Sequence, residues 1–479
     1  MKKRTKIVCT LGPASETPEK IDAMITAGMN VVRLNFSHGT YENHQMLIDR
    51  VRDIAKAHRE PVAILQDLQG PKIRVGVMPK EGAPLEEGQD VVFDTSKTEW
   101  DGQVVPVDYT ELSQFVRPGE RLLLNDGRIE TKIVSVQGTQ IRTKVVVSGS
   151  LTSHKGINVP DTTLKIRALT DKDKQDLRFG VEHSVDFVAV SFVTKPEDII
   201  DVRYLIQQYE KELGIKSPHP IRIIAKIERR EALDRIDAIL DVVDGIMIAR
   251  GDLGVEIPAQ EVPLAQKKLI DKALSAAKPV IVATQMLDSM QSNPRPTRAE
   301  VSDVANAVID HADAVMLSNE TATGSYPVET VTVMRSIIEE TEHSRYDDLT
   351  MREYSKKHQP IDDVMSQMSR LFAERVHAKL ILAASISGDT GRLISRYRPE
   401  LPIMVATGTE RVQRQLNLSW GVHPFILPPC STIEELVERS MVYLKQEKLV
   451  KIADKIVVLA GEPVGVSGHV NLLEVREVR

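Results

Sequence analysis

The stretch Ile223–Pro258 reads IIAKIERREALDRIDAILDVVDGIMIARGDLGVEIP, with two short apolar runs separated by a helix-like segment. The first run, IIAKIE, is rich in β-branched residues, and the second covers Gly245–Ala249, so both predict buried strands. We expect one helix over Arg229–Leu240 between them. Parallel strands that are joined by a crossover helix end at the same edge of their sheet. The stretch therefore predicts a strand–helix–strand unit and decides which residues meet at that edge.

A lysine and two carboxylates mark the carboxyl ends of these two strands. Lys226 and Glu228 are two residues apart, so the alternation of side chains along a strand points both in one direction. Asp252 follows the second strand. Two carboxylates beside an ammonium group suit a divalent cation that holds an anionic substrate. The residues alone therefore predict cation-assisted chemistry on an anion.

Eight apolar runs with strand character occur in the first two-thirds of the chain, and amphipathic helix candidates separate most of them. This alternation predicts an α/β fold, a (β/α)8 TIM barrel. An error of one strand would instead favour an open doubly wound sheet. The expected strands are Lys6–Thr10, Val31–Phe36, Val62–Gln66, Phe187–Phe192, Ile221–Ile227, Gly245–Ala249, Pro279–Ala283 and Ala314–Leu317.

The composition excludes several classes of protein. The 479 residues include 62 Lys and Arg against 68 Asp and Glu, a net charge of −6, so there is no basic surplus for nucleic acid. No apolar run approaches the roughly 20 residues that a membrane span needs. Only Cys9 and Cys430 are present, and no signal peptide is recognisable. We therefore expect a cytoplasmic protein with neither nucleic-acid nor membrane partners.

Two changes in sequence pattern divide the chain. After Asp67, alternating segments are separated by the turn signals Asp126-Gly127 and Gln137-Gly138, which is typical of an all-β meander or small barrel. Such an insert on the third connection would fold over the barrel's C-terminal face as a lid. After Arg345, a polar stretch leads into a new α/β pattern. The expected domains are a barrel at 1–70 and 168–345, a β-barrel lid at 71–167, and a C-terminal α/β domain at 346–479.

Polar residues also end the second strand. The order VVRLNFSH places Arg33, Asn35 and Ser37 on one face at spacing two. An arginine there suits a phosphate, and the neutral oxygens suit a cation. The alternative is a set of barrel-end hydrogen bonds without a role in chemistry.

Cations lie on both connections to the insert. Asp67 ends the third strand, Lys72 and Arg74 follow it at spacing two, and Lys155 lies on the returning connection. Together they could close on a polyphosphate if the insert is a lid. The simpler interpretation of Lys72 or Arg74 is a domain hinge with a solvated basic face.

Hydroxyl groups mark three further places. Thr284 ends the seventh strand, where a threonine is more often a helix cap than a catalyst. Thr297 and Glu300 have the spacing of a capping box. In the C-terminal domain, SISGDTGR at Ser385–Arg392 opens a helix, which suits a phosphate as well as it suits a plain capped helix.

Nine motifs, spread from Lys6 to Glu329, together resemble those of pyruvate kinases. They are KIVCTLGPAS, VVRLNFSHG, DLQGPKIR, KGINVP, AKIE, ARGDLGVEIP, ATQMLDSM, PTRAEVSDVANAV and AVMLSNETATGSYPVE. The resemblance implies a barrel with an inserted β-barrel lid and a C-terminal domain, in a homotetramer. It also implies transfer of a phosphoryl group from phosphoenolpyruvate to ADP, giving pyruvate and ATP, with Mg²⁺ or Mn²⁺.

The resemblance also implies roles for the strand-end residues. Arg33 would hold the phosphate of phosphoenolpyruvate, and Lys226 would stabilise the charge on the transferring phosphoryl group and the enolate. Glu228 and Asp252 would bind Mg²⁺. This distribution fits phosphoryl transfer, which depends on positioning and on neutralising charge.

Other matching positions would serve the remaining parts of the substrates. The backbone of Gly251 and the hydroxyl of Thr284 would contact the carboxylate, and Arg74 and Lys155 would reach the nucleotide phosphates. The proton route would use a water near Thr284 and Ser318. The effector's phosphate, from a sugar phosphate or AMP, would lie at Ser385, Ser387 and Thr390.

One departure concerns K⁺. Many family members coordinate K⁺ through positions that match Asn35, Ser37, Asp67 and a following threonine, with a glutamate where this chain has Lys72. Here Leu68 follows Asp67, so the sequence resembles the K⁺-independent branch. Because an ammonium group can supply the charge of the ion, we expect K⁺ to be dispensable.

Two other functions would also use a barrel of this kind. A Mg²⁺-dependent aldolase or lyase would need a Glu and an Asp at strand ends, but no lid cations such as Arg74 and Lys155. A metabolite-sensing protein without activity would be favoured by loss of Lys226, Glu228 or Asp252, which are all present.

Overall fold

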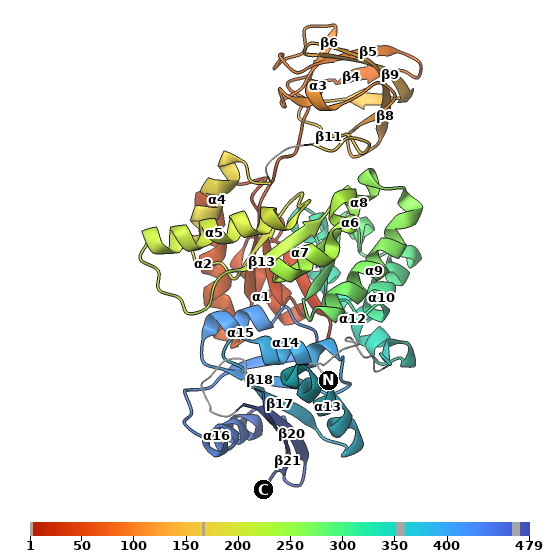
Figure 1. The fold of residues 1–479 in the computed structure, drawn as a ribbon. Helices are drawn as coiled ribbons and strands as arrows, with labels where there is room; N and C mark the ends of the chain where they lie inside the picture. The colour runs from red at the N-terminus through yellow and green to blue at the C-terminus, as the bar shows by residue number, and fades with distance from the viewer. Residues whose placement is uncertain (1–2, 165–167, 351–359, 462–469) are drawn as a thin grey trace.

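The computed structural model describes residues 3–164, 168–350, 360–461 and 470–479, which form three parts stacked one on another (Figure 1). The β-rich insert stands above a barrel, and a C-terminal α/β part lies below it. The domain boundary expected at residue 167 falls outside the described residues.

The central part is a closed barrel of eight parallel strands, in the order β1-β16-β15-β14-β13-β12-β3-β2. This confirms the predicted TIM barrel and rules out the open sheet. Its strands are β1 (Lys6–Thr10), β2 (Val31–Asn35), β3 (Ala63–Asp67), β12 (Phe187–Val190), β13 (Arg222–Ile227), β14 (Gly245–Ala249), β15 (Val280–Ala283) and β16 (Ala314–Leu317).

The barrel interior is apolar and is closed at one end. Val31, Leu65 and Ile224 belong to a buried inner cluster, and Leu418 of the C-terminal part is a member of the same cluster. The C-terminal part therefore covers the end of the barrel at which the strands begin. The opposite end, where polar residues follow the strands, is left for the site.

Helices surround the barrel and pack on its outer face. Their bounds are α1 (Pro18–Ala27), α2 (Tyr41–His58), α4 (Asp171–Glu182), α5 (Pro196–Glu212), α6 (Arg230–Asp234), α7 (Ile236–Val242), α8 (Arg250–Glu256), α9 (Val262–Ser275), α10 (Arg298–Ile309), α11 (Asn319–Ala322) and α12 (Pro327–Glu342). Short 3-10 turns lie at Ala259–Glu261, Asp288–Gln291 and Arg345–Asp347.

Two local predictions about these helices can be compared with the structure. The capping box of α10 is present, with the Thr297 and Glu300 side chains each bonded to the other's backbone nitrogen. The single helix expected over Arg229–Leu240 is wrong. The chain forms α6 and α7 instead, because Arg235 between them adopts φ −108° and ψ 15°, which lies outside the helical range.

The insert lies between β3 and α4 and has its own buried core. Its described strands form a six-stranded sheet, β11-β7-β8-β9-β5-β6, and a two-stranded sheet, β10-β4. Hydrogen bonds do not close these strands into the expected β-barrel. Its elements are β4 (Ala83–Leu85), β5 (Asp90–Asp94), β6 (Val104–Pro106), α3 (Leu112–Phe115), β7 (Arg121–Leu124), β8 (Ile129–Gln137), β9 (Gln140–Val147), β10 (Gly149–Leu151) and β11 (Ile157–Asn158).

The C-terminal part is a five-stranded sheet, β19-β18-β17-β20-β21, in which only β21 is antiparallel to its neighbour. Apolar cores cover both of its faces. Its elements are α13 (Ile361–Arg375), β17 (Leu380–Ala384), α14 (Asp389–Arg396), β18 (Ile403–Thr407), α15 (Glu410–Leu416), β19 (Val422–Ile426), α16 (Ile433–Gln446), β20 (Lys455–Ala460) and β21 (Leu472–Glu477).

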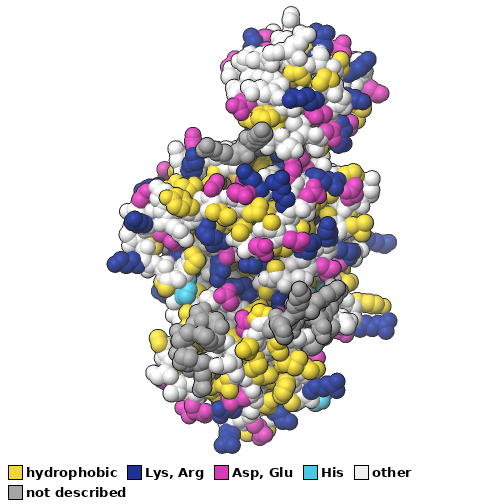
Figure 2. Space-filling view, viewed as in Figure 1, with side chains coloured by type: hydrophobic (Ala, Val, Ile, Leu, Met, Phe, Trp, Pro, Cys, Tyr) yellow, Lys and Arg dark blue, Asp and Glu magenta, His cyan; other side chains and the backbone are white. Residues whose placement is uncertain are grey.

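The surface carries charge of both signs. On the face that Figure 2 shows, Lys and Arg side chains are interspersed with Asp and Glu. Among the described helices, none is long and apolar enough to cross a membrane.

Candidate active site

Three charged side chains share the open end of the barrel. Arg33, Asp67 and Lys226 each follow a residue of the inner cluster by two positions, so alternation directs them into the same mouth. Asp67 is 1% exposed, and the side chains of Arg33 and Lys226 are each 12% exposed. The predicted alternation is therefore what assembles this group.

The three side chains are joined by ion pairs, and Glu228 adds a fourth charge. Arg33 Nε donates to Asp67 Oδ2 at 2.6 Å, and Arg33 Nη1 donates to Thr10 Oγ1 at 3.0 Å. Lys226 Nζ lies 3.4 Å from Asp67 Oδ1 and 2.9 Å from Glu228 Oε1. We call Arg33, Asp67, Lys226 and Glu228 the strand-end cluster.

The charges of the strand-end cluster shift one another's protonation. Burial alone would raise the pKa of Asp67, but Lys226 and Arg33 outweigh it and hold that pKa below its usual value. Burial would lower the pKa of Lys226, but Asp67 and Glu228 outweigh it and raise that pKa. The pKa shifts therefore favour an ionised Asp67 and a protonated Lys226, so Lys226 and Arg33 both bring a positive charge to the barrel mouth.

Glu228 has the properties of a cation ligand. Burial raises its pKa, and although Lys226 lowers that pKa, nearby Asp252 raises it, so the net shift is upward. Glu228 Oε2 accepts a hydrogen bond from the Phe192 backbone nitrogen at 2.6 Å, whereas buried Oε1 has no hydrogen-bond partner besides its ion pair with Lys226.

A divalent cation bound beside Glu228 and Asp252 would compensate the negative charge of these two carboxylates. No group of three or more His, Cys, Asp or Glu that could hold a metal occurs among the described residues. The two carboxylates thus fit a cation such as Mg²⁺, which takes its other ligands from substrate and water.

Gly251 and Thr284 meet at the same end of the barrel. Gly251 N donates to Thr284 Oγ1 at 2.8 Å, and Thr284 Oγ1 donates to Ala283 O at 2.6 Å. Thr284 and the following Gln285 both have positive φ, 73° and 54°. Two consecutive non-glycine residues in this conformation are strained, which is typical of functional sites.

The cations of the insert lie beside the barrel mouth but not on the strand-end cluster. Lys72 Nζ lies 3.6 Å from Asp252 Oδ1 and 3.5 Å from Asp126 Oδ1. Arg74 Nη1 donates to His154 O, and Val75 N donates to Lys155 O. Arg74 and Lys155 therefore lie on two paired segments, which we call the neck, where the chain enters and leaves the insert. Among the described residues, neither Arg74 nor Lys155 forms an ion pair with the cluster.

Asn35 lies next to Asp67, and Ser37 contacts Asn35. Asn35 pairs with Asp67 in the register of β2 and β3, and Asn35 Oδ1 accepts a hydrogen bond from Ser37 N at 3.1 Å. The two oxygens of Asp67 already face Arg33 and Lys226. Lys72 lies at Asp252, and no ion pair between Lys72 and Asp67 is present in the described part of the chain.

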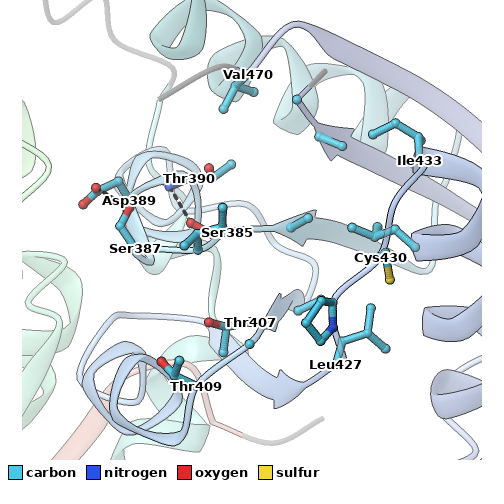
Figure 3. A pocket seen from close by; sticks show the side chains of 18 of the residues that line it. Ser385, Ser387, Asp389, Thr390, Thr407, Thr409, Leu427, Cys430, Ile433 and Val470 are labelled. Atoms are coloured by element: carbon cyan, nitrogen blue, oxygen red, sulfur yellow. Dashed lines mark hydrogen bonds between the residues drawn. The ribbon is translucent and has the colours of Figure 1, made fainter. Parts of the chain in front are cut away.

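Ser385, Ser387 and Thr390 line a cavity of about 380 Å³ in the C-terminal part. Figure 3 shows them on one side of this cavity, with Leu427, Cys430 and Ile433 on the other. Thr390 N donates to Ser385 Oγ at 3.3 Å, at the start of α14. We call this space the C-domain cavity.

One group supports the interpretation of the C-domain cavity as a binding site. Thr407 Oγ1 lines it and is buried without a hydrogen-bond partner in the described structure. A buried hydroxyl without a partner is a group that a ligand could satisfy.

Sequence reasoning missed Ser191 at the barrel mouth. Lys226 Nζ donates to Ser191 Oγ at 2.8 Å, and Ser191 Oγ donates to Leu68 O at 2.7 Å. Ala189, two residues earlier, belongs to the inner cluster, so the same alternation that identified Lys226 would have found Ser191.

Two family models match the chain. The model described as "Pyruvate kinase, barrel domain" matches residues 2–331, and "Pyruvate kinase, alpha/beta domain" matches residues 363–476. The chain belongs to the pyruvate kinase family. The first match covers the barrel together with its insert, and the second covers the C-terminal sheet.

Individual pyruvate kinases agree over nearly the full length. One from Clostridium acetobutylicum is 42% identical over 484 residues, covering 99% of each chain. One from Sporosarcina psychrophila is 42% identical over 479 residues, covering 99% of this chain and 80% of the relative. The crystal structure of a Cryptosporidium parvum pyruvate kinase superimposes with a TM-score of 0.92 at 34% identity, covering 100% of this chain and 96% of that one.

Proposed function

We propose that this member of the pyruvate kinase family transfers the phosphoryl group of phosphoenolpyruvate to ADP, giving pyruvate and ATP. The observation that carries the proposal is the pairing of Lys226 with two buried carboxylates, Asp67 and Glu228, beside the Arg33 guanidinium. This places two fixed cations at one open barrel end, where an anionic substrate and its transferring group can be neutralised together.

Each member of the strand-end cluster has a defined task in this proposal. Arg33, held in place by Asp67 and Thr10, binds the phosphate of phosphoenolpyruvate through its free donors. Lys226 lies within reach of the same phosphate and stabilises the charge that develops on the phosphoryl and enolate oxygens. Asp67 and Ser191 fix the direction of the Lys226 ammonium.

Glu228 and Asp252 would hold Mg²⁺ or Mn²⁺. The bound ion would neutralise charge on the substrate's carboxylate and on the phosphoryl oxygens. Gly251 N and Thr284 Oγ1 would orient the carboxylate, since the Gly251–Thr284 hydrogen bond already holds both groups at this edge. A water near Thr284 would then deliver the proton that converts enolate to pyruvate.

The insert would supply the nucleotide contacts. Arg74 and Lys155 lie on the two paired segments of its neck, so a movement of the insert toward the barrel would carry both cations toward the strand-end cluster together. We therefore assign residues 71–167 to a lid domain between barrel segments 1–70 and 168–345, with 346–479 as the C-terminal domain.

K⁺ is not required in this proposal. The Asp67 carboxylate already faces two protein cations, and the Lys72 ammonium lies beside Asp252. Asn35, Ser37 and Asp67 still offer oxygens, so K⁺ could bind without being needed. Activity with K⁺ replaced by tetramethylammonium tests this, and activity that falls to background would contradict it.

Further features extend the family resemblance. We propose that the C-domain cavity binds the phosphate of an allosteric effector through Ser385, Ser387 and Thr390, and that the enzyme works as a cytoplasmic homotetramer. The unpartnered Thr407 hydroxyl and the apolar opposite wall support a ligand in this cavity.

The decisive test measures ATP and pyruvate together. Purified chain is supplied with phosphoenolpyruvate, ADP and Mg²⁺, and both products are followed by ³¹P and ¹H NMR. We expect equal amounts of ATP and pyruvate. A folded protein that forms no ATP, but cleaves or condenses phosphoenolpyruvate-like acids, would favour the aldolase or lyase alternative.

A further inference from the structure

Strand β13 extends from the edge of the C-domain cavity to the strand-end cluster. It begins at Arg222 and carries Lys226, and Glu228 follows it. His219, which precedes β13 by three residues and belongs to the barrel, lines the C-domain cavity. Four residue steps of an extended strand separate Arg222 from Lys226, a distance of about 13 Å. One short element therefore starts beside the cavity and ends at the lysine of the strand-end cluster.

The Arg222 guanidinium contacts both the barrel and the C-terminal part, whose helix α14 lies directly below the barrel (Figure 1). Nη1 donates to Asp244 Oδ1 at 2.8 Å, within the barrel. Nη2 donates to Ser387 O at 3.2 Å and lies 3.7 Å from Asp389 Oδ1. Ser387 and Asp389 both line the C-domain cavity. Arg222 thus has a short contact with the barrel and longer contacts with the Ser385–Thr390 loop of the cavity.

Asp244 connects the Arg222 side chain to the backbone of β13. Its Oδ2 accepts hydrogen bonds from Ile223 N at 2.9 Å and from Arg203 Nη2 at 3.0 Å. Burial would raise the pKa of Asp244, but Arg222 and Arg203 outweigh it and hold that pKa below its usual value. β13 is paired with β12 on one side and with β14 on the other. A rigid, fully paired strand of this kind can carry a displacement of its first residues to its last.

The charges around the Ser385–Thr390 loop make the contact with Arg222 sensitive to a bound anion. No Lys or Arg is among the described residues that line the C-domain cavity. Besides Arg222, the Arg392 guanidinium contacts the loop, where it donates to Ser387 O at 2.9 Å and to Asp389 Oδ1 at 2.7 Å. An anion at the loop would attract both guanidinium groups. Because the loop contacts of Arg222 are longer than its contact with Asp244, they are the ones that would change.

We propose that Arg222 couples the C-domain cavity to the strand-end cluster through β13. This inference rests on the proposed effector site in the cavity and names the residue by which the barrel responds to it. An anion at the Ser385–Thr390 loop strengthens the contact between Arg222 and the loop, which fixes the start of β13. Lys226 and Glu228 at the other end are then held where they bind phosphoenolpyruvate and the divalent cation. Because coupling is reciprocal, phosphoenolpyruvate at the cluster orders the loop in return.

Hydrogen exchange of the full chain, followed by mass spectrometry, tests the coupling in this second direction. Exchange in residues 385–396 is compared with and without phosphoenolpyruvate and Mg²⁺, in the absence of ADP, so that no phosphoryl transfer occurs. We expect phosphoenolpyruvate to slow exchange in this segment of the wild type by about fivefold or more. The same addition should leave exchange in this segment of Arg222→Met unchanged. This variant should fold, because Asp244 keeps its hydrogen bonds from Arg203 and Ile223 N.

Two further variants separate the coupling from a general loss of charge. Arg203→Met is the matched control, because it removes the other arginine from Asp244, while the described contacts of Arg203 all lie within the barrel. Its loop should respond to phosphoenolpyruvate as the wild type does. Arg222→Lys keeps a cation beside Asp244 but cannot contact Asp244 and Ser387 O together, so its loop response should be lost as well. This variant also tests the proposal if Arg222→Met is too unstable to study.

ATP formation is measured on the same preparations, which separates this coupling from the proposed reaction. A wild type that forms no ATP would contradict the proposed function and the coupling together. A wild type that forms ATP, but whose exchange in residues 385–396 does not respond to phosphoenolpyruvate, would overturn the coupling alone. An equal response in the wild type and Arg222→Met, even with a lower Tm in the variant, would show that Arg222 only joins the two domains. Loss of the response in Arg203→Met as well would assign the effect to Asp244 and overturn the role of Arg222.

Discussion

Lys226 Nζ lies 2.9 Å from Glu228 Oε1, which is otherwise buried without a hydrogen-bond partner. Each group compensates the charge of the other at the end of β13. Burial raises the pKa of Glu228 even in the presence of this ammonium. The pair therefore links the phosphoryl-stabilising lysine to the proposed cation ligand.

Replacing Lys226 by methionine should suppress phosphoryl transfer while the fold persists. The change removes the ammonium that would stabilise the transition state, so we expect kcat to fall by at least about 10²–10³-fold. Circular dichroism should show an intact barrel, and Mn²⁺ should still bind as followed by electron paramagnetic resonance. Lys267→Met, on the exposed face of α9, is the control and should retain full turnover. Near-normal turnover in Lys226→Met would show that the lysine has another role.

The parts of this site that follow from strand alternation could be predicted from sequence. Arg33, Asp67 and Lys226 all continue the inward face of a barrel strand, so spacing two was sufficient to group them. The partner of Lys72 could not be predicted, because Asp252 meets it only through the placement of the insert against the barrel. The break at Arg235 depends on the conformation of one residue.

Replacing Lys72 by methionine should create a need for K⁺. The substitution removes the ammonium beside Asp252 but keeps most of the side chain, so the missing charge must come from the solution. We expect activity of Lys72→Met to be low in tetramethylammonium and partly restored by K⁺, whereas the wild type responds little. Initial rates at fixed ionic strength measure both. If the activity of Lys72→Met responds to K⁺ as the wild type does, the Lys72 ammonium does not take the place of K⁺.

The insert is held against the barrel by a hydrogen bond whose loss should loosen it. Asn158 Nδ2 donates to Glu256 Oε1 at 2.9 Å, and burial already raises the pKa of Glu256. Asn158→Leu should cost about 1–3 kcal/mol at this contact and increase hydrogen exchange in α8. Gln140→Leu removes an amide–carboxylate bond to Asp94 inside the insert, so it should leave exchange in α8 unchanged. Equal hydrogen exchange in α8 of the two variants would show that the Asn158–Glu256 hydrogen bond does not hold the insert against the barrel.

Replacing Thr407 by valine tests the C-domain cavity without changing its shape. Thr407 Oγ1 is buried and makes no hydrogen bond in the described structure, so its removal should leave the ligand-free protein as stable or slightly more stable. If an effector phosphate or hydroxyl satisfies this oxygen, Thr407→Val should raise the concentration needed for half-activation and leave basal turnover unchanged. Thr332→Val, on the exposed side of α12 and outside the C-domain cavity, is the control. Activation that is identical in all three proteins would place the effector elsewhere.

The burial of Lys3 should make stability depend on pH in a defined direction. The pKa of Lys3 is lowered from 10.5 to about 7, mainly by burial and also by the charges of Lys6 and Arg335, while Glu342 and Cys9 oppose the shift. Between about pH 7 and 10.5 the unfolded chain keeps a proton that the folded chain has lost, so stability rises with pH in this window. Below about pH 7 both states are protonated, and the folded protein bears the full cost of the buried charge.

Lys3→Met removes that cost at every pH. In phosphate-free buffer, its gain in Tm over the wild type should therefore be largest near pH 6 and should shrink as the pH approaches 10. A gain in Tm that stays constant from pH 6 to 10 would mean that another charge already compensates the Lys3 ammonium in the folded protein.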